Sequence, residues 1–138
     1  MFETLNQYGL SDIHLMRDGC GLQAIIAIHD TGLGPALGGC RYLHYPCEQA
    51  AIEDAARLAQ GMSYKAALAG LPFGGGKAVI IKPKSDMDRK LLFTKMGDFI
   101  ASLQGRYITA LDSGSTLSDM DVMATRSPYV SSSSQLGD

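Results

Sequence analysis

The sequence has no long hydrophobic run. Its apolar stretches, such as residues 24–28, are far shorter than the roughly 20 residues that a membrane-spanning helix needs. The N-terminal residues do not combine a basic segment with an apolar one, so we expect no signal peptide. We therefore expect a soluble, cytoplasmic protein with no membrane partner.

Basic residues are not in excess either. The chain has 12 Lys and Arg against 14 Asp and Glu, which gives a formal net charge of -2. Proteins that bind nucleic acids usually present a basic face. We therefore expect no nucleic-acid partner.

Cysteine is scarce, and its spacing is not that of a common metal site. The three residues are Cys20, Cys40 and Cys47, an odd number that favours reduced thiols in a cytoplasmic protein. Cys40, His44 and Cys47 would supply only three metal ligands, and a fourth would have to come from elsewhere. We therefore expect no metal site.

Neither of the common nucleotide-binding fingerprints is present. Glycines 74–76 precede Lys77, as in a phosphate-binding loop, but a Walker loop needs Ser or Thr after the lysine and a helix that starts there. Here Ala78 and a β-branched run follow, which favour a strand. No Gly-x-Gly-x-x-Gly segment opens a helix after a strand. A lysine-dependent phosphate binder is therefore the weakest of the functional hypotheses.

What the sequence does contain fits one α/β layered domain. Its 138 residues, 46% of them hydrophobic, can bury a sizeable core. Predicted strands come first and then alternate with helices. We predict strands at residues 12–17, 22–29, 40–45, 77–82, 107–110 and 128–130, and glycine-rich loops at 30–39 and 71–76. We predict helices at residues 48–69, from a cap at Ser85 to about Leu103, and from Ser118 or Asp119 to about Thr125.

The lysine beside the triple glycine is a candidate for chemistry. Glycine lets the backbone approach a ligand closely, so Lys77 would be half enclosed by the chain. A desolvated lysine can serve as a base near neutral pH. The alternative is an exposed lysine at the start of a strand, which is the common situation for this residue type.

Four sequence blocks together identify a family. They are GPALGGCR at residues 34–41, AIEDAARLAQGMSYK at 51–65, AGLPFGGGK at 69–77 and GRYITA at 105–110. In this order and spacing they closely resemble the N-terminal domain of the leucine/phenylalanine/valine dehydrogenases, within the glutamate dehydrogenase superfamily. The resemblance covers roughly Leu10 to Val130 and implies an open, mixed sheet flanked by helices.

The resemblance implies a substrate-binding role for the end of the long helix. Lys65 would bind the α-carboxylate of the substrate, and Met62 would touch its apolar side chain. The two residues are three positions apart, so they share one helix face. The alternative is that Met62 belongs to the core and that Lys65 is a solvated helix end.

The resemblance also implies the reacting groups. Lys77 would be the catalytic lysine, and Asp112 would carry protons to and from the amino group, with Gly38 and Gly39 lining the pocket through their backbone. The alternative for Asp112 is a turn residue whose side chain bonds to the following backbone.

Leu37 indicates the class of substrate. The glutamate enzymes place a lysine in this region to pair with the side-chain carboxylate of glutamate, and here the position is Leu37. An unpaired carboxylate against Leu37 and Met62 would be costly to desolvate. An aliphatic or aromatic L-amino acid, such as leucine, valine or phenylalanine, is therefore favoured.

The implied activity is reversible oxidative deamination of the L-amino acid to the 2-oxo acid and ammonia, with NAD as the cofactor of the full-length enzymes. We assign residues 1–130 to a substrate-binding and oligomerisation domain and predict a disordered, serine-rich tail at 131–138. The NAD-binding Rossmann domain should follow, and a domain of about 100–150 residues is not in this sequence. The chain is thus a piece of a longer homo-oligomeric enzyme or, alternatively, a truncated, non-catalytic oligomerisation module.

We predict that the 138-residue chain alone does not reduce NAD with leucine, valine or phenylalanine, because the resemblance places cofactor binding in a separate domain. NADH absorbance measures this directly, with a full-length leucine dehydrogenase as the positive control. Formation of NADH by the purified chain would contradict the prediction.

Overall fold

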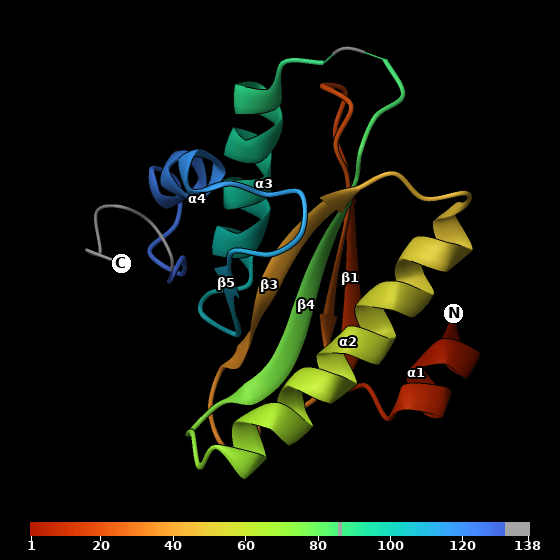
Figure 1. Ribbon diagram of the computed structural model, residues 1–138, viewed down its shortest axis with the longest axis vertical. Coiled ribbons are helices and arrows are strands. Elements are labelled where there is room, and N and C mark those ends of the chain that lie inside the picture. Colours follow the sequence, from red (N-terminus) through yellow and green to blue (C-terminus); the bar gives the residue numbers. More distant parts are fainter. Residues whose placement is uncertain (86, 132–138) are drawn as a thin grey trace.

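A computed structural model describes residues 1–85 and 87–131, and it has three layers (Figure 1). The strands are β1 (Asp12–Arg17), β2 (Gln23–Ile28), β3 (Ala36–Leu43), β4 (Gly74–Ile81) and β5 (Tyr107–Ala110). The helices are α1 (Phe2–Tyr8), α2 (Glu48–Leu68), α3 (Arg89–Ser102) and α4 (Leu117–Ala124). The predicted α/β class is confirmed.

The sheet is mixed and open, as predicted. Its order is β1-β2-β4-β3-β5. The pairs β1–β2 and β2–β4 are antiparallel, whereas β4–β3 and β3–β5 are parallel. Helix α2 connects the parallel neighbours β3 and β4, and such a crossover places its helix on one face of the sheet. The carboxyl ends of β3, β4 and β5 therefore point the same way.

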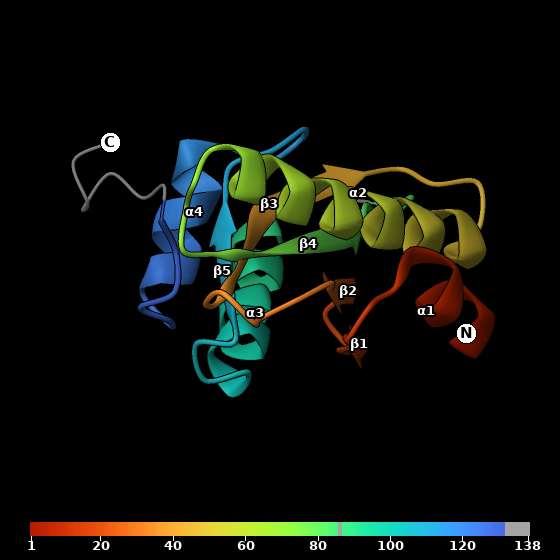
Figure 2. The same cartoon turned by 90° about the horizontal axis from the view of Figure 1, so that it is seen from below.

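Each face of the sheet has its own core. Helix α2 covers one face, and α3 and α4 cover the other (Figure 2). Under α2 the core is built largely from alanines, because the small side chains let the helix approach the strands. These buried alanines are Ala51, Ala55, Ala56 and Ala59. The core under α3 and α4 holds larger residues, including Tyr107 and Phe93.

The two predicted glycine-rich loops are partly strand. β3 begins at Ala36 rather than at the predicted residue 40, and β4 begins at Gly74 rather than at 77. Glycine disfavours strands by propensity, but here close approach of neighbouring groups requires it. A Cβ added to Gly75 would lie 2.2 Å from the backbone N of Ser63 and 2.3 Å from the carbonyl of Ala59, both in α2. Helix α2 therefore packs directly on the backbone of Gly75, whereas a Cβ on Gly74 would meet the Asp30 carbonyl and one on Gly76 the Tyr107 ring.

Several helix ends differ from the prediction. The third helix begins at Arg89 with Asp88 as its N-cap, which accepts a hydrogen bond from the Leu91 N–H at 3.1 Å, so the predicted cap at Ser85 is wrong. The last helix begins at Leu117, where Thr116 and Asp119 form a capping box. Helix α1 was not predicted, and its seven residues offer only two turns of periodic signal.

The predicted last strand and tail lie at the edge of the described residues. Val130 forms a single parallel bridge with Thr109 rather than a full strand. Ser131 donates its N–H to the Thr109 carbonyl at 2.9 Å. The rest of the predicted tail, residues 132–138, lies outside the described residues. No helix within the described ranges is long and apolar enough to cross a membrane.

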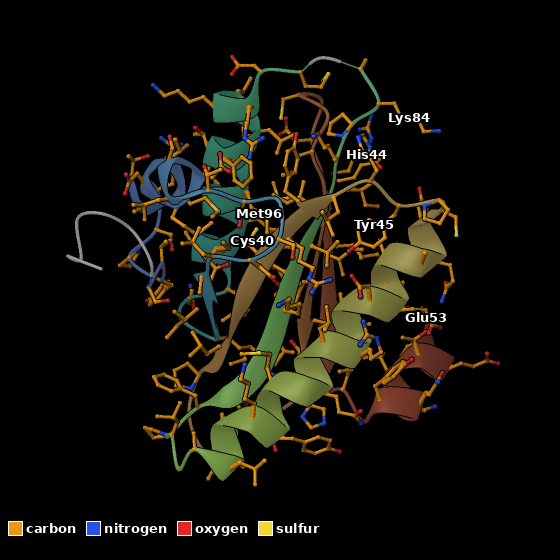
Figure 3. All side chains as sticks on the ribbon, in the orientation of Figure 1. Cys40, His44, Tyr45, Glu53, Lys84 and Met96 are labelled. Atoms are coloured by element: carbon orange, nitrogen blue, oxygen red, sulfur yellow. The ribbon has the colours of Figure 1, made fainter. Side chains whose placement is uncertain are left out.

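The structure does not support a metal site from Cys40, His44 and Cys47. Cys40 is fully buried in the core under α3, near Met96 (Figure 3), whereas His44 and Cys47 are exposed. Burial raises the pKa of the Cys40 thiol to about 12, which opposes the thiolate that a metal needs. No group of His, Cys, Asp or Glu side chains in the described part of the chain is arranged to hold a metal ion.

We predict opposite effects of two glycine-to-alanine substitutions. Gly75→Ala should lower the free energy of unfolding by about 1–3 kcal/mol or more, because its methyl group would overlap the α2 backbone. Gly61→Ala should raise it by up to about 1 kcal/mol, because Gly61 lies within α2 and a Cβ there meets nothing within 4 Å. Urea unfolding of both variants measures the two values. A Gly75→Ala protein as stable as the wild type would contradict the close approach.

Candidate active site

Lys77 is a buried lysine in the middle of the sheet. It lies in β4 between Gly75, which packs on α2, and Val79, which belongs to the core under α2. Only 6% of the residue is exposed. A buried ammonium group is costly unless it is paired. Its partner is Asp112, whose Oδ2 forms an ion pair with the Lys77 Nζ, so the interpretation of Lys77 as an exposed lysine is wrong.

Asp112 reaches this lysine from the loop after β5, across β3. The space for it comes from Gly39, because a Cβ on Gly39 would lie 2.6 Å from the Asp112 Cβ. The Asp112 Oδ1 accepts a hydrogen bond from the Ser113 N–H at 2.7 Å, and its backbone N–H donates to the Ser115 hydroxyl at 3.1 Å. Asp112 thus makes the local turn contact with one oxygen and the ion pair with the other.

The surroundings of Asp112 keep its carboxyl group ionised. Partial burial by itself raises the pKa of Asp112. The hydrogen bond from Lys77, the Ser113 N–H and the positive charges of Lys77 and Arg41 outweigh burial, and the net effect lowers the pKa below its ordinary value. The pair therefore places a proton acceptor, the Asp112 carboxylate, beside a proton donor, the Lys77 ammonium group, at a site largely shielded from solvent.

A second cation contacts the same carboxylate, and sequence reasoning did not identify it. The Nε of Arg41 donates to the Asp112 Oδ2 at 3.2 Å, and its Nη1 donates to the Asp54 Oδ2 at 3.3 Å. The Tyr45 hydroxyl also donates to the Asp54 Oδ2, at 2.5 Å. Arg41 and Asp54 both lie within the blocks that carry the family resemblance. Their meeting, however, depends on how β3 lies under α2.

Ser63 ties the last turns of α2 to the glycine run. Its hydroxyl accepts a hydrogen bond from the Gly75 N–H at 2.8 Å and lies 2.7 Å from the Nδ1 of His29. The His29 N–H in turn donates to the Gly75 carbonyl at 2.9 Å. This arrangement fixes the helix segment that carries Met62 and Lys65 with respect to β4.

The remaining predicted site residues are placed as follows. Leu37 pairs in register with Gly75, and both Leu37 and Met62 are half-buried. The Gly38 carbonyl accepts a hydrogen bond from the Tyr107 hydroxyl at 2.6 Å. Lys65 is exposed near the end of α2 and makes no ion pair with any described residue. The structure therefore joins Lys77, Asp112 and Gly39, and the convergence of Lys65 with them in one cleft stays a prediction.

The phosphate-loop hypothesis is not supported. Residues 74–76 belong to β4 rather than to a loop, and Lys77 is followed directly by the rest of this strand, to Ile81, instead of by a helix. The Lys77 ammonium group is engaged by a carboxylate. A phosphate loop needs free backbone N–H groups at a helix start and an available lysine.

These features define a class: an α/β domain in which a glycine-rich strand carries a buried lysine that is paired with an aspartate. The model of the Glu/Leu/Phe/Val dehydrogenase dimerisation domain matches residues 10–129. The chain is 51% identical over 132 residues to leucine dehydrogenase of Bacillus subtilis, covering 94% of this chain and 36% of that protein. It is 51% identical over 120 residues to valine dehydrogenase of Streptomyces coelicolor, covering 86% of this chain and 33% of that protein.

Solved structures show the same fold. L-tryptophan dehydrogenase from Nostoc punctiforme matches with a TM-score of 0.87 and 44% identity, over 94% of this chain and 38% of that one. The chain therefore belongs to the Glu/Leu/Phe/Val dehydrogenase family, as its sequence blocks predicted. It spans about a third of the length of the curated relatives it matches.

We predict that the Lys77–Asp112 pair contributes to stability in a pH-dependent way. Asp112→Asn leaves a buried cation unpaired, which costs about 3–5 kcal/mol when burial is complete, and less here because the Asp112 side chain is 16% exposed. Because the pKa of Asp112 is lowered on folding, its contribution is present above the unfolded pKa of about 3.9 and is lost as pH falls through the folded pKa.

Urea unfolding of the wild type, Asp112→Asn, Lys77→Met and the double variant gives the coupling energy. At neutral pH the free energy of unfolding should be larger for the wild type than for Asp112→Asn. This difference should shrink below about pH 4. A difference that is independent of pH would show that the ionised pair does not form.

Proposed function

We propose that this chain is the substrate-binding part of an amino acid dehydrogenase that oxidatively deaminates an aliphatic or aromatic L-amino acid. The observation that carries the proposal is the buried Lys77–Asp112 pair. A buried lysine and the carboxylate beside it can between them accept and donate protons. The relatives named leucine, valine and tryptophan dehydrogenases support this class of reaction.

In the proposed mechanism, Lys65 binds the substrate carboxylate and the pair moves protons. Asp112 accepts a proton from the substrate amino group, so that the amine carries a free electron pair. NAD, when bound, would accept the hydride from the substrate α-carbon. Water adds to the imino carbon and gives one proton to the Lys77 amine, which also stabilises the charges of this step. Asp112 returns its proton to the nitrogen, the carbon–nitrogen bond breaks, and the remaining hydroxyl proton leaves with the ammonia as the carbonyl forms. The products are the 2-oxo acid and ammonia.

Leu37 and Met62 are the proposed contacts for the substrate side chain. Leu37 lies next to Gly75 across the β3–β4 register, and Met62 precedes the Ser63 that binds this glycine. Both are apolar and half-buried. A substrate carboxylate placed against them would lose its hydration without gaining a partner. The proposed substrate is therefore apolar rather than acidic.

The residues that the structure describes do not fit a dinucleotide. A dinucleotide site uses a glycine-rich turn between a strand and a helix start. The glycine run of this chain lies inside β4 and is covered by α2. We therefore assign no cofactor contact to the described residues, and in our proposal NAD binds elsewhere in the longer enzyme.

The second candidate function is assembly. The matched family model is described as a dimerisation domain. At one edge of the described sheet lies β1, where Leu15 is 57% exposed. An edge strand with unpaired backbone groups can pair with a second copy. We propose that the chain forms a homo-oligomer, and size-exclusion chromatography with light scattering measures its mass. A monomer at all concentrations would exclude this role.

We predict distinct kinetic effects for the two lysines in an enzyme that joins this chain to a nucleotide-binding domain. Lys77→Ala should lower kcat by about 10²–10⁴-fold, because it removes a proton-transfer group. Lys65→Ala should mainly raise KM, because a carboxylate partner acts in the ground state and the transition state alike. Steady-state deamination of leucine and valine measures both effects.

The matched control is Lys90→Ala, an exposed lysine of α3 on the other face of the sheet, which should change neither constant. If Lys77→Ala kept its turnover and only weakened substrate binding, Lys77 would be a binding residue and the assigned roles would be wrong.

A further inference from the structure

We propose that Arg41 is a positioning residue that holds the Asp112 carboxylate against Lys77, and that Asp54 and Tyr45 hold Arg41 in turn. This inference rests on the proposed function, because it assigns Arg41 a part in the same proton transfer. It goes further in placing control of the Asp112 orientation with residues of β3, α2 and the segment that joins them.

The geometry of Arg41 is that of a bridge between two carboxylates. Its Nε donates to the Asp112 Oδ2 at 3.2 Å, and its Nη1 donates to the Asp54 Oδ2 at 3.3 Å. Asp54 lies in α2, above the sheet, and Asp112 lies in the loop after β5. A guanidinium group can address two acceptors at once in a fixed plane, whereas a lysine is a point charge on a flexible stem.

Asp54 is itself held by several donors. Its Oδ1 accepts a hydrogen bond from the Nη2 of Arg57 at 2.9 Å, and its Oδ2 accepts from the Tyr45 hydroxyl at 2.5 Å as well as from Arg41. Burial, and then the hydrogen bond to Asp54, raise the pKa of Tyr45 well above its ordinary value, so its hydroxyl stays a donor. In Figure 3, Tyr45 lies between the end of β3 and α2.

The contacts on Asp112 leave its carboxylate little freedom. Lys77 and Arg41 both address Oδ2, and the Ser113 N–H addresses Oδ1. On the other side, the Asp112 Cβ packs so closely on Gly39 that a side chain on Gly39 would overlap it. The charged groups that face this carboxylate are therefore Lys77 from β4 and Arg41 from β3, with Asp54 of α2 behind Arg41. Proton transfer needs such fixed distances, since a displacement of about 1 Å can cost 10²-fold in rate.

The alternative is that Arg41 is only a strut between β3 and α2. A strut would affect stability, and its charge would still act on the titration of Asp112, but its loss would not lower kcat at an unchanged KM. The titration therefore checks the contact, and the balance between kcat and KM checks the role. The test therefore uses two readouts on Arg41→Gln, Arg41→Lys and Asp54→Asn. Its matched control is Arg126→Gln, because Arg126 pairs with Asp98 of α3, away from the site.

The first readout is the titration of the Asp112 carboxyl carbon by NMR in the 138-residue chain. Arg41→Gln should move the titration midpoint to higher pH, because one of two cations on the carboxylate is lost. Arg41→Lys should keep the midpoint closer to that of the wild type, and Arg126→Gln should leave it unchanged. An unmoved midpoint in Arg41→Gln, in a protein that unfolds cooperatively, would falsify the contact on which the proposal stands.

The second readout is kinetic, in the enzyme that joins this chain to a nucleotide-binding domain. Arg41→Gln, Arg41→Lys and Asp54→Asn should each lower kcat by roughly 10- to 100-fold with little change in KM. Full recovery of kcat by Arg41→Lys would mean that charge alone matters, and the positioning role would be wrong. An increase in KM alone would also overturn it.

The two readouts separate this inference from the proposed function. If wild-type turnover does not depend on Lys77, the proposed function fails, and the positioning role in catalysis fails with it, whatever the titration gives. If Lys77→Ala removes turnover while the Arg41 variants keep it, the proposed function stands and only the positioning role is wrong.

Discussion

The site depends on how closely α2 approaches β4. Alanines on the helix and Gly75 on the strand leave no side chains to keep the two apart, and the Ser63 hydroxyl binds the Gly75 backbone directly. This contact sets the depth at which Lys77 is buried. A lysine at that depth needs a charged partner, so the packing of small residues creates the electrostatic requirement that Asp112 meets.

The answer to that requirement is a chain of alternating charges rather than one isolated pair. The chain of charges runs from β4 across β3 to α2. Asp112 pairs with both Lys77 and Arg41, and Arg41 also pairs with Asp54. Charges arranged this way compensate one another for the loss of hydration. The ion pairs of the candidate site are therefore a consequence of how α2 packs on the sheet.

The sequence allowed much of this to be predicted, for identifiable reasons. The continuous apolar run of β2 indicated a buried strand, and the spacing of apolar residues in α2 indicated a helix. The family resemblance indicated Lys77 and Asp112. The glycine starts of β3 and β4 were missed because local propensity disfavours a strand there, whereas tertiary contact requires it. The Arg41–Asp54 contact was missed because it depends on the position of a helix over a sheet, which no local pattern encodes.

The strand that leads to Asp112 is short and lies at an edge of the described sheet. On its outer side it is held by the exit segment, where the Thr109 N–H donates to the Tyr129 carbonyl at 3.0 Å and the Ser131 N–H donates to the Thr109 carbonyl at 2.9 Å. Residues 129–131 thus bind the strand that leads to the carboxylate. Among the strands, β5 is the one these bonds contact, so the placement of Asp112 beside Lys77 depends on a short segment near the end of the described chain as well as on the sheet.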